Sequence, residues 1–275
     1  MSLKYLLSLG FIVLLLPHTA SAQQNDVNPL LDSDFVLAAG VFFPTKEFRF
    51  RVDGSLPGEG IDFGDAFRLS NDDSTAAVNL HWRFGEKWSV AGQYWKLSDS
   101  STATLDRDIQ WEDVVFEEGS FARAGVGLEV IRLFFGRTFS AAERHEFGLG
   151  IGLHWLEVSA SVEGQIRTNL EDSELYRGSV SADAPLPNIG AWYTYAFSPK
   201  WALQSRLDWL SASVGDYSGG LTNASVGVNW AIWKHVGVSL SYNYFQLNVD
   251  VDKNDWQGAT KVSQYGPTLA ISAYW

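Results

Sequence analysis

The C-terminal segment of the chain, Tyr265 to Trp275, alternates large apolar side chains with small or polar ones and ends on an aromatic residue. Successive side chains of a β-strand point to opposite faces, so this period of two gives the segment one apolar face. That face carries Tyr265, Pro267, Leu269, Ile271, Ala273 and Trp275. A strand of this kind is typical of a transmembrane β-barrel, whose wall meets lipid outside and the lumen inside.

Residues 1–22 have the features of a secretory signal peptide. Lys4 supplies a positive charge, residues 6–16 are apolar, and Ala20-Ser21-Ala22 offers small residues for cleavage before Gln23. The apolar run is shorter than the about 20 residues that a spanning helix needs. An N-terminal membrane anchor is the alternative. We expect a signal peptide over 1–22 and one β-barrel domain over 23–275.

Composition excludes several classes of function. The chain has no cysteine, which rules out disulfides, thiol nucleophiles and cysteine-ligated metals. Its net charge of −12 argues against a nucleic-acid partner, because phosphate binding needs Lys and Arg. Residues 148–152 alternate glycine with Leu and Ile but lack the spacing of a phosphate-binding loop. We therefore predict no cofactor.

Short turns flanked by aromatic residues recur along the chain. The clearest are Phe84 to Trp88 and Phe197 to Trp201, with looser versions at 139–145 and 230–235. They alternate with longer polar connections at about 53–74, 107–118, 165–186, 214–219 and 252–260. Short periplasmic turns, long external loops and aromatic girdles at the membrane boundary are features of outer-membrane barrels.

The turns divide the chain into about ten strands. Their expected ranges are 35–52, 75–84, 88–106, 119–138, 145–164, 187–197, 200–213, 219–232, 236–251 and 261–275. The predicted fold is all-β, a transmembrane antiparallel up-and-down β-barrel. Eight or twelve strands remain open, since Pro44 can break the first strand. A soluble β-sandwich produces the same alternation and stays an alternative.

These features together resemble the small bacterial outer-membrane β-barrel (porin-like) proteins. The resemblance implies location in the bacterial outer membrane, with outer-membrane lipid and lipopolysaccharide as surroundings. It also implies a C-terminal sorting signal read by the barrel-assembly machinery. On this chain the signal residues are Tyr265, Leu269, Ile271 and Trp275.

Strand alternation points a set of polar side chains into the lumen. The expected lumen-lining residues are His81, Arg83, Gln93, Glu129, Arg132, His154, Gln204, Arg206 and Asp208. Barrels of about eight strands are filled by side chains, so we favour a salt-bridged plug over a narrow selective conduit. Inward glycines at 148, 150 and 152 either accept a bulky inward residue such as Trp192 or Trp95, or leave open space.

The apolar alternation changes phase at two places. Val126, Leu128 and Val130 share one parity, whereas Ile131 and Leu133 share the other. A similar change occurs near 155–156. Either a β-bulge lies at these points or the strands leave the bilayer there.

The leading function is therefore structural, or narrow-channel passage of a small solute or ion. A first alternative is an outer-membrane enzyme, a protease or lipid hydrolase, for which His154 with Glu157 is the conceivable pair. The second alternative is the secreted soluble β-sandwich. Acidic residues in the long connections, at 62–73, 112–118 and 171–174, could hold Ca²⁺ or Mg²⁺ and bridge to lipopolysaccharide phosphates.

Overall fold

The computed structural model describes residues 27–53, 74–104, 109–111, 114–116, 119–169, 172–214, 217–253 and 256–275. The predicted signal peptide and nearly all of the first long connection lie outside these residues. Among the described residues, no helix has the length and apolarity to cross a membrane.

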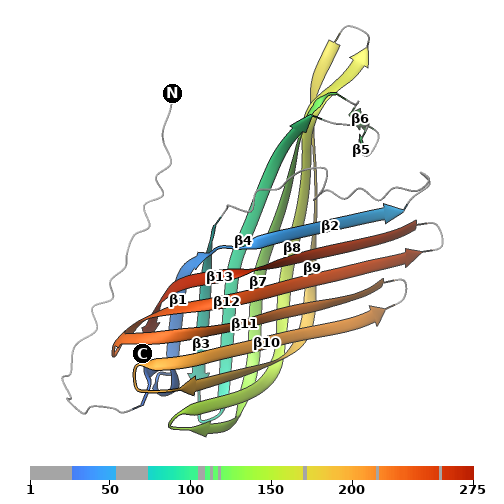
Figure 1. Ribbon diagram of the computed structural model, residues 1–275. Helices are drawn as coiled ribbons and strands as arrows, with labels where there is room; N and C mark the ends of the chain where they lie inside the picture. The colour runs from blue at the N-terminus through green and yellow to red at the C-terminus, as the bar shows by residue number, and fades with distance from the viewer. Residues whose placement is uncertain are drawn as a thin grey trace, which may run out of the picture.

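The described chain is a closed antiparallel barrel of ten strands, with one further strand because the first is broken in two. Figure 1 shows the arrangement. The sheet order is β1-β3-β4-β7-β8-β9-β10-β11-β12-β13-β2, and β1 also pairs with β13 to close the ring. The bounds are β1 Phe35–Phe42, β2 Thr45–Asp53, β3 Thr75–Phe84, β4 Trp88–Thr104, β7 Phe121–Ala142, β8 His145–Asn169, β9 Asp172–Ala196, β10 Trp201–Val214, β11 Tyr217–Trp233, β12 Val236–Lys253 and β13 Trp256–Tyr274.

The predicted fold class is confirmed, and most strand starts agree within a few residues. The break at Pro44 is also present, since β1 ends at Phe42 and β2 begins at Thr45. The connection expected over 165–186 is wrong, because β8 continues to Asn169, β9 begins at Asp172, and the two strands pair along this stretch. Part of the connection at 107–118 forms a small hairpin of β5 (Ile109–Trp111) and β6 (Val114–Phe116).

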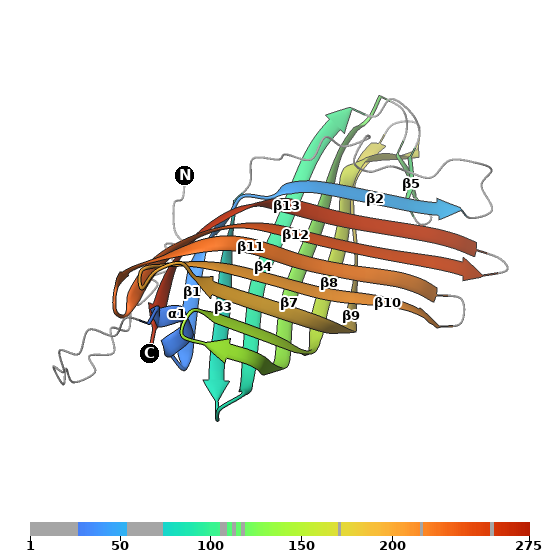
Figure 2. The ribbon, with the colours of Figure 1, turned by 60° about the horizontal axis from the view of Figure 1, so that its bottom comes forward.

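The first and last strands meet where the barrel closes. The amide of Trp275 donates to the carbonyl of Phe35 at 2.9 Å, and the amide of Phe35 donates to the carbonyl of Trp275 at 3.0 Å. Their rings pack edge to face with centroids 5.5 Å apart. Phe35 follows a short helix, α1 (Pro29–Asp32), which lies at this end of the barrel (Figure 2). Terminal pairing removes the sheet edges that an open barrel would expose.

At the opposite end the wall divides into two diverging sheets, which both ribbon views show (Figures 1 and 2). We call β4, β7, β8 and β9 beyond the barrel the β4–β9 extension, and β10 to β13 with β2 the β10–β2 extension. Strand β9 pairs with β10 only from Ile189 to Ala196, although it begins at Asp172. On the other side, β4 beyond Trp95 pairs with β7 alone, while β2 pairs with β13.

Two prolines explain why β9 and β10 separate. Pro185 and Pro187 come just before Ile189, the residue at which pairing with β10 begins. Proline has no amide hydrogen to donate, so it is confined to strand edges and bulges. Their partners are therefore on β8 alone, where they lie opposite Trp155 and Leu153. The sequence makes this stretch of β9 an edge strand.

The outer wall of the barrel is apolar, unlike the surface of a soluble sandwich. The most exposed large side chains on it include Ile151, Leu240 and Ile271, each at least 60% exposed. Where β4, β7, β8 and β9 continue beyond the barrel, four charged residues lie side by side across them: Lys96, Glu129, Glu157 and Asp183. This row of charged residues marks the end of the apolar belt on the β4–β9 side.

The phase changes at 130–131 and 155–156 involve no bulge. Pairing of β7 with β8 runs without a register shift from Ala122 to Thr138. Val126, Leu128 and Val130 are buried inside, whereas Ile131 and Leu133 are exposed outside. The strands therefore keep one alternation, and what changes along them is which face is apolar. Of the two expected explanations, departure from the apolar belt accounts for the pattern.

Candidate functional site

The lumen of the barrel is occupied at three successive levels. The closed end holds α1 and an ion pair, the middle holds a buried polar network beside a cavity, and the divided end holds an apolar cluster. The cavity between the two outer levels is the candidate functional site, and we call it the chamber.

Helix α1 forms the floor of the chamber. The Asn28 side chain caps the helix by accepting a hydrogen bond from the amide of Leu30 at 3.0 Å, and it donates to the carbonyl of Ser198 at 3.2 Å. Capping of this kind stabilises a helix start by about 1 kcal/mol. Leu30 packs with Val36 and Tyr274 in a small apolar cluster. The helix is thereby fixed across the end of the lumen.

Arg83 ties this floor to the wall. Its guanidinium donates to the carbonyl of Leu30 at 2.7 Å and to that of Ser33, and pairs with Glu146 at 2.9 Å. Glu146 also accepts a hydrogen bond of 2.7 Å from the indole of Trp192. Arg83, Glu146 and Trp192 come from β3, β8 and β9, so this network joins distant parts of the ring.

Trp192 fits because its neighbours lack side chains. A Cβ added at Gly148 would lie 2.1 Å from the Trp192 ring, and one added at Gly136 would lie 2.5 Å from it. Neither contact is sterically allowed, so glycine is required wherever this indole lies flat on the wall. The pairing of inward glycine with Trp192 expected from the sequence is present at Gly148.

The middle level is built around one fully buried ion pair. Arg132 on β7 donates to both carboxylate oxygens of Asp208 on β10, at 2.6 and 2.8 Å. Both side chains are at most 2% exposed, and the Arg132 guanidinium lies 4.6 Å from the ring centre of Phe134. A two-pronged charged contact is the strong form of hydrogen bond, and this one spans strands that are not neighbours. It joins β7 to β10 across the lumen-facing side of β8 and β9, which lie between them in the ring.

His154 extends the network without meeting the cavity. Its Nδ1 lies 3.0 Å from Asn188 Oδ1, its Nε2 lies 3.0 Å from Asn223 Nδ2, and its side chain is fully buried. Asn223 donates in turn to Gln93 at 3.2 Å, and Arg206 donates to the same Gln93 oxygen at 2.9 Å. Strands β4, β8, β9, β10 and β11 are thus connected through side chains alone.

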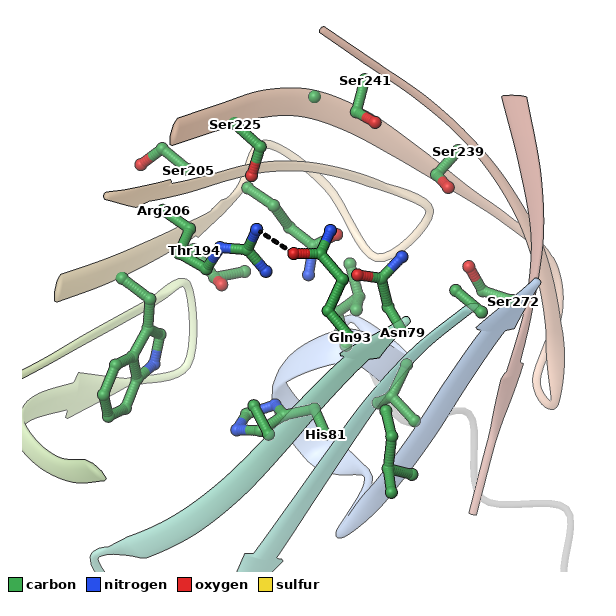
Figure 3. Close-up of a pocket in the computed structure, with 18 of the residues that line it drawn as sticks. Asn79, His81, Gln93, Thr194, Ser205, Arg206, Ser225, Ser239, Ser241 and Ser272 are labelled. Atoms are coloured by element: carbon green, nitrogen blue, oxygen red, sulfur yellow. Dashed lines mark hydrogen bonds between the residues drawn. The ribbon is translucent and has the colours of Figure 1, made fainter. Parts of the chain in front are cut away.

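The chamber lies beside this network and has a volume of about 200 Å³. Figure 3 shows Asn79, His81 and Gln93 on one side of it, and Arg206 on the other side with the serines of the neighbouring strands. The asymmetry has a simple cause. Strands β7 to β9 contribute bulky residues such as Phe134 and Trp192, while the other wall offers small ones: Ser225, Gly227, Ser239, Ser241, Ala270 and Ser272. Space is left where the side chains are short.

The apolar cluster forms the roof. Leu97, Val126, Leu128 and Leu156 of the β4–β9 extension pack against residues of the β10–β2 extension, namely Leu221, Phe245, Leu247 and Val262. Trp95 meets Phe245 edge to face at 5.4 Å. Lys46 and Asp99 form a buried ion pair of 3.3 Å between the two extensions. The two sheets are therefore joined by an interior like that of a soluble protein.

The structure places most of the expected lumen residues around the chamber. His81, Arg83, Gln93, Arg132, Gln204 and Arg206 line it. His154 and Asp208 are fully buried in the adjoining network. Glu129 differs from the expectation because it shares the outward parity of Ile131 and pairs with Lys96 at 2.7 Å on the outer face. The expectation was wrong because the apolar side chains change from the inner to the outer face between Val130 and Ile131.

The expected sorting residues lie on the outer face of β13. Leu269, Ile271 and Trp275 are each about half exposed or more, and Tyr265 is half-buried. The same strand sends Tyr274 inward, where its hydroxyl donates to Asn229 at 2.7 Å. Recognition of this strand by assembly machinery stays a prediction.

Several residues of the site were not expected from the sequence. Glu146 and Asn188 complete the networks, and α1 closes the floor. The inward parity of Glu146 and Asn188 on β8 and β9 was the available signal. Helix α1 gave a weaker one, an Asn-Pro pair typical of a helix start.

The pair proposed for catalysis does not come together. His154 is inward and fully buried, whereas Glu157 lies on the exposed outer face. The other described histidines are His81 beside the chamber and His145 and His235 near the turns of the closed end. Most of the acidic connection residues expected to bind divalent cations lie outside the described residues.

Comparison with solved structures identifies the fold. The chain is similar to the outer membrane protease OmpT from Escherichia coli, with 12% sequence identity, a TM-score of 0.59, and coverage of 89% of this chain and 97% of that one. The chain has the outer-membrane β-barrel fold. It is also similar to the outer membrane protein OprG from Pseudomonas aeruginosa, with 9% identity, a TM-score of 0.35, and coverage of 92% and 98%. No family model and no curated protein matches the chain.

Proposed function

We propose that the protein spans the bacterial outer membrane as a closed barrel, and that its lumen holds a solute chamber rather than a continuous open pore. The observation that carries this proposal is the combination of an exposed apolar belt with a lumen filled both below and above the chamber.

The belt supports a lipid environment. Soluble monomers rarely expose apolar patches larger than a few hundred Å². Here large apolar side chains are exposed on strands all around the ring, from Leu37 on β1 to Ile271 on β13. Aromatic residues, among them Trp88, Phe197, Trp201 and Trp230, gather near the short turns, as girdles do at a membrane boundary. Outer-membrane lipid and lipopolysaccharide are then the surroundings, and the C-terminal strand is the part offered to the barrel-assembly machinery.

The seals support a closed resting state. An ion crossing the lumen would have to pass α1 with its Arg83 contacts, and then the apolar roof around Leu128 and Phe245. Apolar constrictions stop ions by excluding water. Narrow passage of a small solute therefore requires at least the roof to move.

Planar-bilayer recording tests the closed state. The purified wild-type barrel should give no steady conductance, whereas a Leu128→Ala/Phe245→Ala variant that also carries Arg83→Ala should conduct, because it weakens the roof and the floor together. The matched control is Leu133→Ala, which shortens an outward residue of the same strand and should stay silent. Steady conductance by the wild type would contradict the proposal.

Fractionation tests the location independently. The mature protein should appear in the outer-membrane fraction and require detergent for release. Its folded form should migrate faster on an unheated SDS gel than after boiling. Recovery in periplasmic extract without detergent would overturn the membrane assignment.

A further inference from the structure

Arg206 is a largely buried cation, 18% exposed, and its nearest carboxylate already binds another guanidinium. Asp208 gives both oxygens to Arg132, at 2.6 and 2.8 Å. The Nε of Arg206 lies 3.6 Å from Asp208 Oδ2, too far for a good hydrogen bond, and it has no hydrogen-bond partner in the described chain. Asp208 therefore neutralises one guanidinium of the two beside it.

The hydrogen bonds that Arg206 does make go to neutral groups. Its Nη2 donates to Gln93 at 2.9 Å and, more weakly, to Asn223 at 3.4 Å. Amide oxygens orient a guanidinium but do not cancel its charge. Burial of a charge without a partner of opposite sign is unfavourable, and proteins usually provide a counter-ion.

The other charged residues near the chamber do not neutralise the positive charge of Arg206. Around the chamber, Arg83 is matched by Glu146 at 2.9 Å and Arg132 by Asp208. Lys46 and Asp99 pair with each other nearer the roof. The described residues at the level of the chamber thus carry one positive charge in excess, and it belongs to Arg206.

The strands that follow β10 in the ring supply hydroxyl groups. Ser225, Ser239, Ser241 and Ser272 come from β11, β12 and β13 and face the space that Arg206 borders (Figure 3). A hydroxyl can donate to an anion oxygen as readily as it accepts from a cation. The chamber volume of about 200 Å³ corresponds to several waters at about 30 Å³ each, or to one small organic ion with its hydration.

We propose that the chamber binds a small monovalent oxyanion, a carboxylate of about the size of acetate, with Arg206 as its main partner and the serine hydroxyls as secondary donors. One charge fits because one guanidinium is unmatched, and a carboxylate fits because it accepts two parallel N–H donors from arginine. This inference deepens the proposed function, on which it rests for the solute chamber, by naming the class of solute.

Calorimetric titration of sodium acetate into the barrel, folded in neutral detergent at low chloride, tests the inference. Acetate should bind saturably, whereas acetamide, which has nearly the same shape without the charge, should not. Inorganic phosphate should bind more weakly than acetate at a pH where it is mainly a dianion. The gel shift on heating shows separately that the barrel is folded, so a failure of binding is not confused with a failure of the membrane fold.

Two variants and a control make the test specific. Arg206→Gln should weaken acetate binding about tenfold to a hundredfold, the range expected for a charged hydrogen bond. Gln93→Glu places a carboxylate next to Arg206 and should abolish binding while keeping the heat-sensitive gel band. The control Arg137→Gln removes a guanidinium from the outer face, where it lies over Trp88, and should leave binding unchanged. Unaltered binding in Gln93→Glu, or none in the folded wild type, would overturn the proposal.

Discussion

The barrel and its two extensions are built from the same strands with opposite arrangements of polarity. On β7, Arg132 faces inward and Leu133 outward within the barrel, whereas Leu128 faces inward and Glu129 outward within the extension. On β12 the inward residue changes from Asn243 to Phe245 in a single step of the alternation. No register shift separates the two regions on β7 and β8.

The difference shows how the surroundings select the interior. Apolar side chains are driven inward only where the outer face meets water. Inside the belt, the outer face is itself apolar, so the lumen is free to hold polar groups provided that they satisfy one another. Beyond the belt, the two sheets pack like a sandwich. Each prediction below probes one side of this contrast, from the largest expected effect to the smallest.

Arg132→Ala should cause the largest loss of stability, about 3–5 kcal/mol, because it leaves Asp208 buried without its partner. The measurement is urea unfolding in lipid vesicles, followed by loss of the fast-migrating gel band. The double variant Arg132→Met/Asp208→Leu should recover much of this loss, since it removes both charges. Equal stability of Arg132→Ala and wild type would show that the polar interior is not what holds the barrel.

Leu128→Ala should lower the free energy of unfolding by about 3 kcal/mol, because it opens a cavity in the apolar roof. Leu133→Ala on the same strand is the matched control and should cost less, since Leu133 is exposed on the outer wall. The two variants are compared by the same urea titration. If they lose the same amount, the extension does not have the packed interior described above.

Leu133→Lys should destabilise the barrel by about 2 kcal/mol in lipid vesicles, because a cation on the lipid face is unfavourable in proportion to its depth. Glu157→Lys, in the row of charged residues beyond the belt, should have a much smaller effect. Unfolding in vesicles of different bilayer thickness sharpens the test. A Leu133→Lys variant as stable as Glu157→Lys would move the boundary of the belt.

Tyr274→Phe should have the smallest effect, about 1 kcal/mol, because it removes one hydrogen bond to Asn229 at the closed end. Urea unfolding measures it, and Tyr242→Phe on the outer face is the matched control, expected to be close to wild type. A loss of several kcal/mol would instead show that the terminal strand depends on this contact for closure.

Much of the fold was predictable because its signals are local. Alternation fixed the faces of β3, β10, β11, β12 and β13, and aromatic turns marked the short connections. The extent of β8 and β9 was not predictable from composition, because Ser, Gly, Asp and Pro over 165–186 resemble a loop. These residues form strands because each pairs with its neighbour in a long hairpin, and the register of a hairpin is a property of two segments together.

The sequence predicted which residues belong to the site better than it predicted their contacts with one another. Parity alone identified Arg132, Arg206 and Asp208 as inward, but which guanidinium Asp208 binds depends on the stagger of strands far apart in the sequence. Glu129 illustrates the limit. It was expected in the lumen because it is a polar residue between the apolar Leu128 and Val130. In the extension the apolar side chains face inward, so Glu129 faces outward.

Pro185 and Pro187 influence whether copies of this protein associate with one another. Exposed rims of sheets are where neighbouring chains can attach by adding a strand, which leads to fibres and swapped dimers. Two missing amide donors make the free border of β9 a poor template for such attachment. Replacement of both prolines with residues that donate an amide, such as threonine, is expected to increase self-association.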